Sequence, residues 1–455
     1  MDPNTTSRRT FLGLVGGGAL AAGLAACGSS GPTSTPGSTT GAGGGGGAGS
    51  GATYWFLTGQ PQQAIREAQV KRFNDANSST KLKTTEFQND AFKQKIKTAI
   101  GAGQGPTLIW GWGGGGLKSY VQANQVEDLT DFFSQNAKLK ESIFPSAFGA
   151  ATVNGKAYAM PVETVTPIVL FYDKRAFDKI GAQPPKTWGE ILDLVPKFNA
   201  KGIAPFSLGG QSRWTNMMWL EFLFDRIGGK EVFQNIYDGK KDGWSDPSAI
   251  KALEEMQKLI KANGFIKGFS SITADSNADQ ALLFTGKAAM MLHGAWTYGN
   301  MKSSGGDFVT GGHLGYMNFP PVDGGKGDPS DTVGNPGQYL SISSKASDAD
   351  KATAKKFLAN YTLDDASVSD WVKSGNIAVA KSSKDKLSSI TDKFDSEWLN
   401  FVYDTASGAK NFAQSWDQAL SPSQAETLLD NIAKLFQLSI SPQQFATNMN
   451  AVIGQ

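Results

Sequence analysis

The chain is poor in the residues from which many catalytic and structural sites are built. Cysteine occurs once, as Cys27, and histidine twice, as His293 and His313, among 455 residues. A lone cysteine cannot form an intrachain disulfide, and these counts exclude a structural zinc site, which needs four Cys or His ligands. Carboxylate-based calcium sites stay possible, but no EF-hand spacing is present. We therefore expect no cofactor and no metal centre.

The chain also lacks an excess of charge of either sign. It carries 43 Lys and Arg against 41 Asp and Glu, a net charge of +2 at pH 7. Nucleic-acid binding relies on strongly basic surfaces, so this balance gives no reason to expect it. Aromatic residues, in contrast, make up 11% of the chain and include 11 tryptophans. The length suggests two domains.

The first 26 residues have the pattern of an export signal. Arg8 and Arg9 precede an apolar, glycine-rich stretch at 11–26, which is shorter than the roughly 20 apolar residues of a membrane span. The paired arginines suggest the twin-arginine route. Small residues before Cys27 resemble the lipobox of bacterial lipoproteins. We therefore predict a signal peptide at 1–26, lipidation of Cys27 and anchoring on the outer face of the cytoplasmic membrane.

A segment rich in Gly, Ser, Thr, Ala and Pro then precedes the folded chain. This composition cannot bury enough apolar surface to fold, so 27–52 is predicted to be a lipid anchor and flexible linker. Short apolar runs, typical of strands, then alternate with helical patterns. The predicted strands cover 53–57, 82–87, 107–110, 166–172, 288–292 and 314–319. This alternation predicts an α/β fold with a parallel sheet.

Three pairs of segments follow one another in a specific order and spacing. They are FYDK at 171–174 with PKTWGEI at 185–191, GKAAM at 286–290 with GAW at 294–296, and SISSK at 341–345 with AKKFL at 354–358. Together they resemble the family 1 extracellular solute-binding proteins, the class of the maltodextrin-binding protein, over nearly all of 53–455. Within that family, the tryptophan-rich loops are most similar to members that bind short plant-derived oligosaccharides such as xylobiose.

The resemblance implies a two-lobed α/β fold of the type II periplasmic-binding-protein kind, with a ligand cleft between lobes joined by hinge crossings. The implied parts are an N-lobe at 53–163, a C-lobe at 164–332, an N-lobe return at 333–363 and a helical part of the C-lobe at 364–455. The implied function is reversible binding of a small neutral oligosaccharide, about the size of a disaccharide, without turnover. A monomer would deliver it to the permease subunits of an ABC importer.

Sugar chemistry indicates which residues to expect in the cleft. A pyranose has C–H-rich faces that suit indole rings and a rim of hydroxyls that suit polar groups. Trp112 follows a strand and is a first candidate platform, and Gly113 and Gly114 beside it would let the backbone approach a ligand. By the resemblance, three further indoles face the cleft: Trp214, Trp296 and Trp416. Core packing is the alternative for each tryptophan, and we expect Trp110 to pack inward.

Polar candidates come from the crossings and from the ends of strands. Glu163 matches a position where the family often places a ligand-binding carboxylate, the alternative being a solvated loop acid. Loops at strand ends supply rim contacts. The candidates there and near the last crossing are Thr58, Gln60, Glu86, Asn89, Asp90, Gln338 and Asn376.

Nucleotide binding is a rival reading of the glycine run. Gly111, Gly113 and Gly116 fit G-x-G-x-x-G, but an isolated match of this kind is weak. A P-loop fails, because Leu117 stands where its lysine belongs.

Two further functions stay open. A secreted glycoside hydrolase would need two carboxylates about 5–10 Å apart, for which Glu163 and Glu221 are the nearest candidates. A binding protein for a charged solute would need arginines converging on the cleft, and only Arg213 is placed for that.

Overall fold

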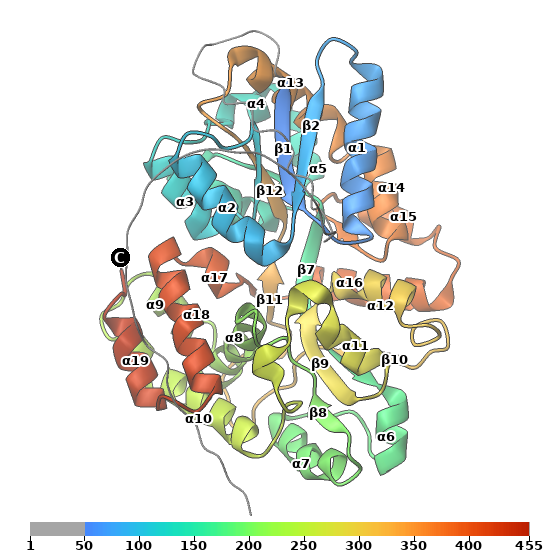
Figure 1. Cartoon of the computed structure of the whole chain (residues 1–455), viewed down its shortest axis with the longest axis vertical. Helices are drawn as coiled ribbons and strands as arrows, with labels where there is room; N and C mark the ends of the chain where they lie inside the picture. The colour runs from blue at the N-terminus through green and yellow to red at the C-terminus, as the bar shows by residue number, and fades with distance from the viewer. Residues whose placement is uncertain (1–50, 455) are drawn as a thin grey trace, which may run out of the picture. The chain divides into compact units, whose positions relative to one another are not determined.

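The computed structural model describes residues 51–454. The predicted signal peptide and lipidated cysteine, and nearly all of the predicted linker, lie outside the described residues. Two separate sheets, each with its own apolar core, divide the described residues into two lobes (Figure 1). This architecture confirms the predicted two-lobed α/β fold. Within the described range, no helix combines the length and apolarity that crossing a bilayer requires.

The first lobe is built on a five-stranded sheet in the order β2-β1-β3-β12-β6. The first three strands run parallel, as predicted, and the last two pair antiparallel. In β1, the buried residues Ala52, Tyr54 and Phe56 alternate with less buried ones, because successive side chains point to opposite faces. The strands are β1 (Ala52–Leu57), β2 (Leu82–Phe87), β3 (Leu108–Gly111), β6 (Met160–Val162) and β12 (Gln338–Ile342). The helices are α1 (Gln62–Ala76), α2 (Asn89–Gly101), α3 (Gly114–Gln122), α4 (Thr130–Gln135), α5 (Ala137–Ser142), α13 (Asp348–Tyr361) and α14 (Asp365–Lys373), and a small hairpin joins β4 (Thr152–Val153) to β5 (Lys156–Ala157).

The second lobe is organised around β7 (Thr164–Asp173), of which nine residues are buried. Ile168 and Leu170 pack into one apolar cluster and Val169 and Phe171 into another, so β7 is covered on both faces. Its sheet runs β14-β11-β7-β9-β8, and two short strands also pair with β7. The strands are β8 (Ala204–Phe206), β9 (Ala288–Gly294), β10 (Leu314–Met317), β11 (Thr332–Asn335), β13 (Ile377–Ala378) and β14 (Phe412–Gln414). The helices are α6 (Lys174–Ile180), α7 (Trp188–Asn199), α8 (Trp214–Gly228), α9 (Glu231–Tyr237), α10 (Pro247–Lys261), α11 (Ala278–Phe284), α12 (Thr297–Ser304), α15 (Ser383–Leu387), α16 (Lys393–Gly408), α17 (Trp416–Ala419), α18 (Pro422–Phe436) and α19 (Pro442–Asn450).

Three segments cross between the lobes. Glu163, with a φ of +61°, joins β6 to β7, and residues 336–337 join β11 to β12. The predicted return began at 333, but β11 pairs with β7 in the second sheet. The predicted helical part of the C-lobe began at 364, yet α14 lies beside α1 (Figure 1), where Arg72 donates to Ser367 Oγ at 2.7 Å. We therefore draw the second crossing at 336–337 and the third between α14 and α16, at 374–392. Within this last segment β13 pairs with β7, whereas residues 379–381 still bond to residues 142–144 of the first lobe.

Candidate functional site

A cavity of about 290 Å³ lies between the two lobes, where loops after β1 and β3 face α8, α11 and the turn from β9 to α12. Eight of the residues predicted to bind ligand line it: Thr58, Gln60, Asn89, Trp112, Glu163, Trp214, Trp296 and Gln338. Other polar and aromatic residues of this lining were not among the predicted ligand contacts: Gln62, Arg66, Lys93, Trp110, Asp275, Asn277, Gln280, His293, Asn300, Asp417 and Gln418.

Three half-buried tryptophans from both lobes meet at this cavity. Trp112 follows β3, Trp214 begins α8 after the positive-φ residue Arg213, and Trp296 caps α12. The rings of Trp214 and Trp296 lie 6.1 Å apart between centroids. The indoles are therefore gathered around one interlobe space, which is the arrangement that stacking on a sugar requires.

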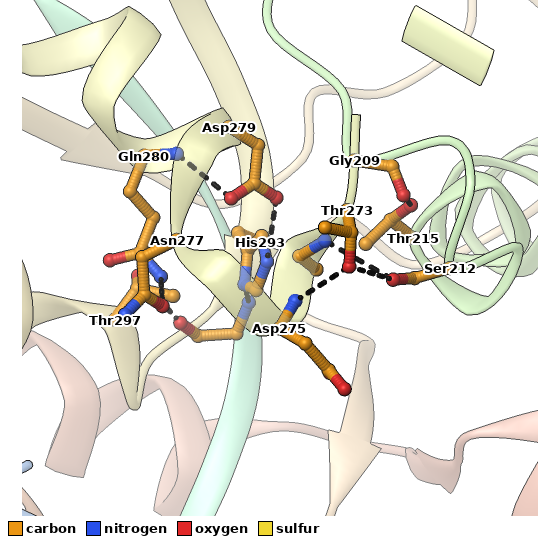
Figure 2. A network of polar contacts seen from close by, with 12 residues as sticks. Gly209, Ser212, Thr215, Thr273, Asp275, Asn277, Asp279, Gln280, His293 and Thr297 are labelled. Carbon is orange, nitrogen blue, oxygen red and sulfur yellow. Dashed lines mark hydrogen bonds and ion pairs between the residues drawn. The ribbon is translucent and has the colours of Figure 1, made fainter. Parts of the chain in front are cut away.

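His293 lies behind two of these indoles, at the centre of the network in Figure 2. Its buried imidazole is 5.5 Å from the ring of Trp214 and 5.4 Å from that of Trp296, nearly perpendicular to both. The backbone N–H of Gly294 donates to Nδ1 at 2.9 Å, and Nε2 lies 3.3 Å from Asp279 Oδ2. Nε2 and this carboxylate oxygen are both buried and make no hydrogen bond in this arrangement. Asp279 therefore packs beside the ring that contacts both indoles, and the hydrogen bond from Gly294 orients that ring.

Side-chain amides beside this network supply groups suited to sugar hydroxyls. Asn300 donates to Gln280 Oε1 at 2.7 Å, and Gln280 Nε2 donates to Asn277 Oδ1 at 2.8 Å. These three amides line the cavity. Each of them both donates and accepts, as a hydroxyl does.

Glu163 is already bound by protein groups. Arg66 donates to both carboxylate oxygens at 2.7 Å, and Trp110 Nε1 donates to Oε1 at 2.8 Å. The side chains of Arg66 and Glu163 are only 5% and 4% exposed. A carboxylate accepts about four hydrogen bonds, so three donors leave little capacity for a sugar. Trp110 is buried, as predicted, yet it also reaches the cavity lining.

Six predicted contacts lie outside this cavity. They are Glu86, Asp90, Gly113, Gly114, Asn376 and Trp416. Trp416 is 1% exposed and stacks on Phe233 at 4.6 Å, because the first turn of α17 directs it into the core of the second lobe. The buried amide of Asn376 binds Ser374 instead.

Direct contacts close the two lobes over the cavity. Lys93 Nζ lies 2.9 Å from Asp417 Oδ2, and Gln62 Nε2 donates to the carbonyl of Trp296 at 3.1 Å. On the same side, the backbone N–H of Asp90 donates to Asp275 Oδ2 at 3.0 Å. These bonds join α1 and α2 to the second lobe.

Among the described residues, no basic side chain in the cavity lining is without a carboxylate partner, and Asp275 adds a further acidic group. The basic side chains in this lining are Arg66 and Lys93, and each is paired with a carboxylate. Burial raises the pKa of Asp275, and the nearby Asp90 carboxylate adds to this effect. Arg213, the candidate for charged solutes, pairs with acidic residues of α18 outside this cavity.

The two carboxylates considered for hydrolysis do not share this site. Glu221 is buried in the second lobe, accepts the backbone N–H of Trp416 at 2.7 Å and does not line the cavity. Burial raises its pKa to about 8. The arrangement of a carboxylate pair across one scissile bond is therefore not formed by Glu163 and Glu221. Within residues 51–454, no group of three or more His, Cys, Asp or Glu side chains is placed to hold a metal ion.

Comparison with known proteins finds similar sequences over parts of the described region and similar structures over nearly all of it. A family model described as bacterial extracellular solute-binding protein matches residues 58–368. An uncharacterised ABC transporter extracellular-binding protein of Pyrococcus horikoshii is 26% identical over 305 residues, 66% of this chain and 67% of the relative. The maltotriose-binding protein of Pyrococcus abyssi is 26% identical over 238 residues, 52% of this chain but only 46% of the relative. A solved structure from a study of xylan utilization by Caldanaerobius polysaccharolyticus superposes with a TM-score of 0.79 and 28% identity, covering 89% of this chain and all of that one.

Proposed function

Because the chain belongs to the bacterial extracellular solute-binding proteins, we propose that it binds a small neutral oligosaccharide reversibly and delivers it to the permease of an ABC importer. The family is one of binding proteins and not of enzymes. The observation that carries the proposal is the meeting of Trp112, Trp214 and Trp296, from both lobes, at one interlobe cavity. Indoles opposite amides suit the two kinds of surface that a sugar presents.

Charge supports a neutral ligand. Both basic side chains of the cavity are neutralised, by Glu163 and Asp417, and Asp275 adds an acidic group with a raised pKa. An anionic sugar would have to displace one of these carboxylates or face them without a partner cation, and either change costs free energy.

Size supports a short ligand. The cavity volume of about 290 Å³ is at the lower end of the range of about 300–1,000 Å³ for small-molecule sites. We propose a ligand of disaccharide size, with xylobiose as the first candidate, because one similar structure comes from work on xylan utilization.

An extracellular family implies an exported protein. We propose further that Cys27 carries a lipid, that 27–52 tethers a monomeric binding domain to the outer face of the membrane, and that two permease subunits are its partners. Globomycin treatment of the expressing cells would test the anchor, since it blocks cleavage of lipoprotein signal peptides.

Ligand binding is tested with the domain beginning at residue 51. Xylobiose, maltose and an acidic disaccharide are compared by thermal shift and calorimetry, because a ligand at a hundred times its Kd stabilises the folded state by about 2.7 kcal/mol. We expect a neutral disaccharide to raise the Tm, and Trp214→Ala and Trp296→Ala to abolish most of that rise. Tyr237→Ala, at a side chain that is 50% exposed, is the control. A response to the acidic sugar alone, or release of sugar products on long incubation, would contradict the proposal.

A further inference from the structure

The space between the lobes continues beyond the tryptophans. A second cavity, of about 320 Å³, adjoins the first. Six residues line both cavities: Lys93, Trp110, Trp112, Trp214, Asp417 and Gln418. We call this shared set the dividing wall.

An ion pair stands at the centre of the dividing wall. Lys93 Nζ lies 5.1 Å from the ring centroid of Trp112 and 5.9 Å from that of Trp214. Asp417 Oδ2 accepts from Lys93 Nζ at 2.9 Å and from Gln418 Nε2 at 2.7 Å. Both distances from the ammonium to the rings fall within cation–π range. A sugar ring passing between the two indoles would have to displace this ammonium group.

The second cavity has a lining that suits a sugar. Trp112 and Trp214 take part in it, together with Tyr120, Gln94 and Ser212. Its lining therefore combines aromatic rings with neutral polar groups, as the first cavity does. It also contains aliphatic side chains, such as Leu117 and Leu429, and an ion pair between Arg213 and Glu426. The Lys93–Asp417 pair separates it from the first cavity.

We propose that the Lys93–Asp417 pair sets the length of the ligand, and that the second cavity is a further sugar subsite closed off by this pair. The inference rests on the proposed function, because it concerns the same oligosaccharide. With the ion pair in place, a short ligand fills the first cavity, and a longer chain cannot extend into the second cavity. Without it, the two cavities join and a longer chain gains contacts with Tyr120 and Gln94.

The test compares ligand lengths in matched variants. Calorimetry with neutral oligosaccharides of two, three, four and six units is performed on the wild type and on Lys93→Met combined with Asp417→Asn. The double variant removes both charges, so no buried charge is left unpaired, and the methionine keeps most of the lysine stem. Lys95→Met is the control, since Lys95 is an exposed lysine of the same helix and lines neither cavity.

In the wild type, we expect the tetrasaccharide to bind at least about tenfold more weakly than the disaccharide. In the double variant, this ratio should fall to about one or reverse, whereas Lys95→Met should keep the wild-type ratio. An unchanged ratio in the double variant, or equal binding of all lengths by the wild type, would overturn the proposal. If the wild type bound no neutral oligosaccharide of any length, the proposed function itself would be wrong, which is a separate result.

Discussion

Closure of the lobes requires a glycine at position 115. Gly115 lies in the first turn of α3, against the end of α17 in the opposite lobe. A Cβ built on it would lie 1.9 Å from the carbonyl oxygen of Leu420 and 2.8 Å from that of Ala419. Since Cβ atoms essentially never approach other atoms within 3.0 Å, Gly115→Ala should force the two backbones at least about 1 Å apart. The two lobes could then not close as far as they do in this structure.

The same substitution should not harm the fold. Alanine is favoured over glycine in a helix by about 1 kcal/mol, and the clash exists only when the lobes are closed. An overpacked contact costs about 1–3 kcal/mol, which corresponds to a Kd raised roughly 5- to 150-fold. We therefore expect Gly115→Ala to weaken sugar binding while the Tm of the protein without sugar stays the same or rises.

Gly116→Ala is the matched control for this prediction. Gly116 lies in the same helix, but a Cβ there meets no atom within 4 Å. This variant should gain the higher helix propensity of alanine and keep the wild-type Kd for sugar. Calorimetry gives the affinities, and small-angle X-ray scattering with saturating sugar should show Gly115→Ala remaining more expanded than Gly116→Ala. Equal affinity in the two variants would refute the view that this contact limits closure.

Three other substitutions test the site and its support. Arg66→Met should lower the free energy of unfolding by about 3–5 kcal/mol in urea titrations, because it leaves Glu163 buried without its cation; a loss below about 1 kcal/mol would contradict this. His293→Ala should weaken sugar binding about tenfold and alter tryptophan fluorescence, since it removes two ring contacts of about 0.5–1.5 kcal/mol each, whereas His313→Ala should do neither. Burial raises the pKa of Glu221 from 4.5 to about 8. At pH values between these two, Glu221 is protonated in the folded state and loses its proton on unfolding. The free energy of unfolding should therefore fall as pH rises from about 5 to 8, by up to about 1.4 kcal/mol per pH unit. Glu221→Gln should remove that slope in urea titrations at several pH values, and a slope shared by wild type and variant would show that other groups cause it.

Local patterns predicted strands of both sheets, because strand periodicity is a local feature. Strand ends and the family resemblance together predicted eight residues of the cavity lining. The contacts that decide the site are not local. Lys93 and Asp417 are 324 positions apart, and no pattern near either residue indicates their pairing. Similarly, Glu163 stands at the predicted crossing, but its partner Arg66 belongs to a helix 97 positions earlier. The sequence could place this carboxylate at the crossing, but it could not show that its oxygens were already bound by Arg66 and Trp110.

The glycines after β3 illustrate a second limit of prediction from sequence. Gly113 and Gly114 were predicted to let the backbone approach a ligand, and the structure instead brings backbone from other segments close to them. A Cβ on Gly114 would lie 2.4 Å from the carbonyl oxygen of Gln418, in the opposite lobe. The missing side chain permits either kind of approach equally well, so composition alone cannot distinguish a ligand contact from a contact between lobes.

One short helix connects closure with ligand length. The side chain of Asp417 in α17 holds Lys93, while the backbone at the end of α17 meets Gly115. Substitutions that share a structural element are not expected to act additively. If Gly115→Ala moves α17 away by about 1 Å, the 2.9 Å bond between Lys93 and Asp417 lengthens as well. Gly115→Ala should therefore weaken binding of the disaccharide more than that of the tetrasaccharide, whereas a variant that only hinders closure would weaken both equally. Calorimetry with the two ligands distinguishes these outcomes, and equal losses would show that α17 does not couple the two features.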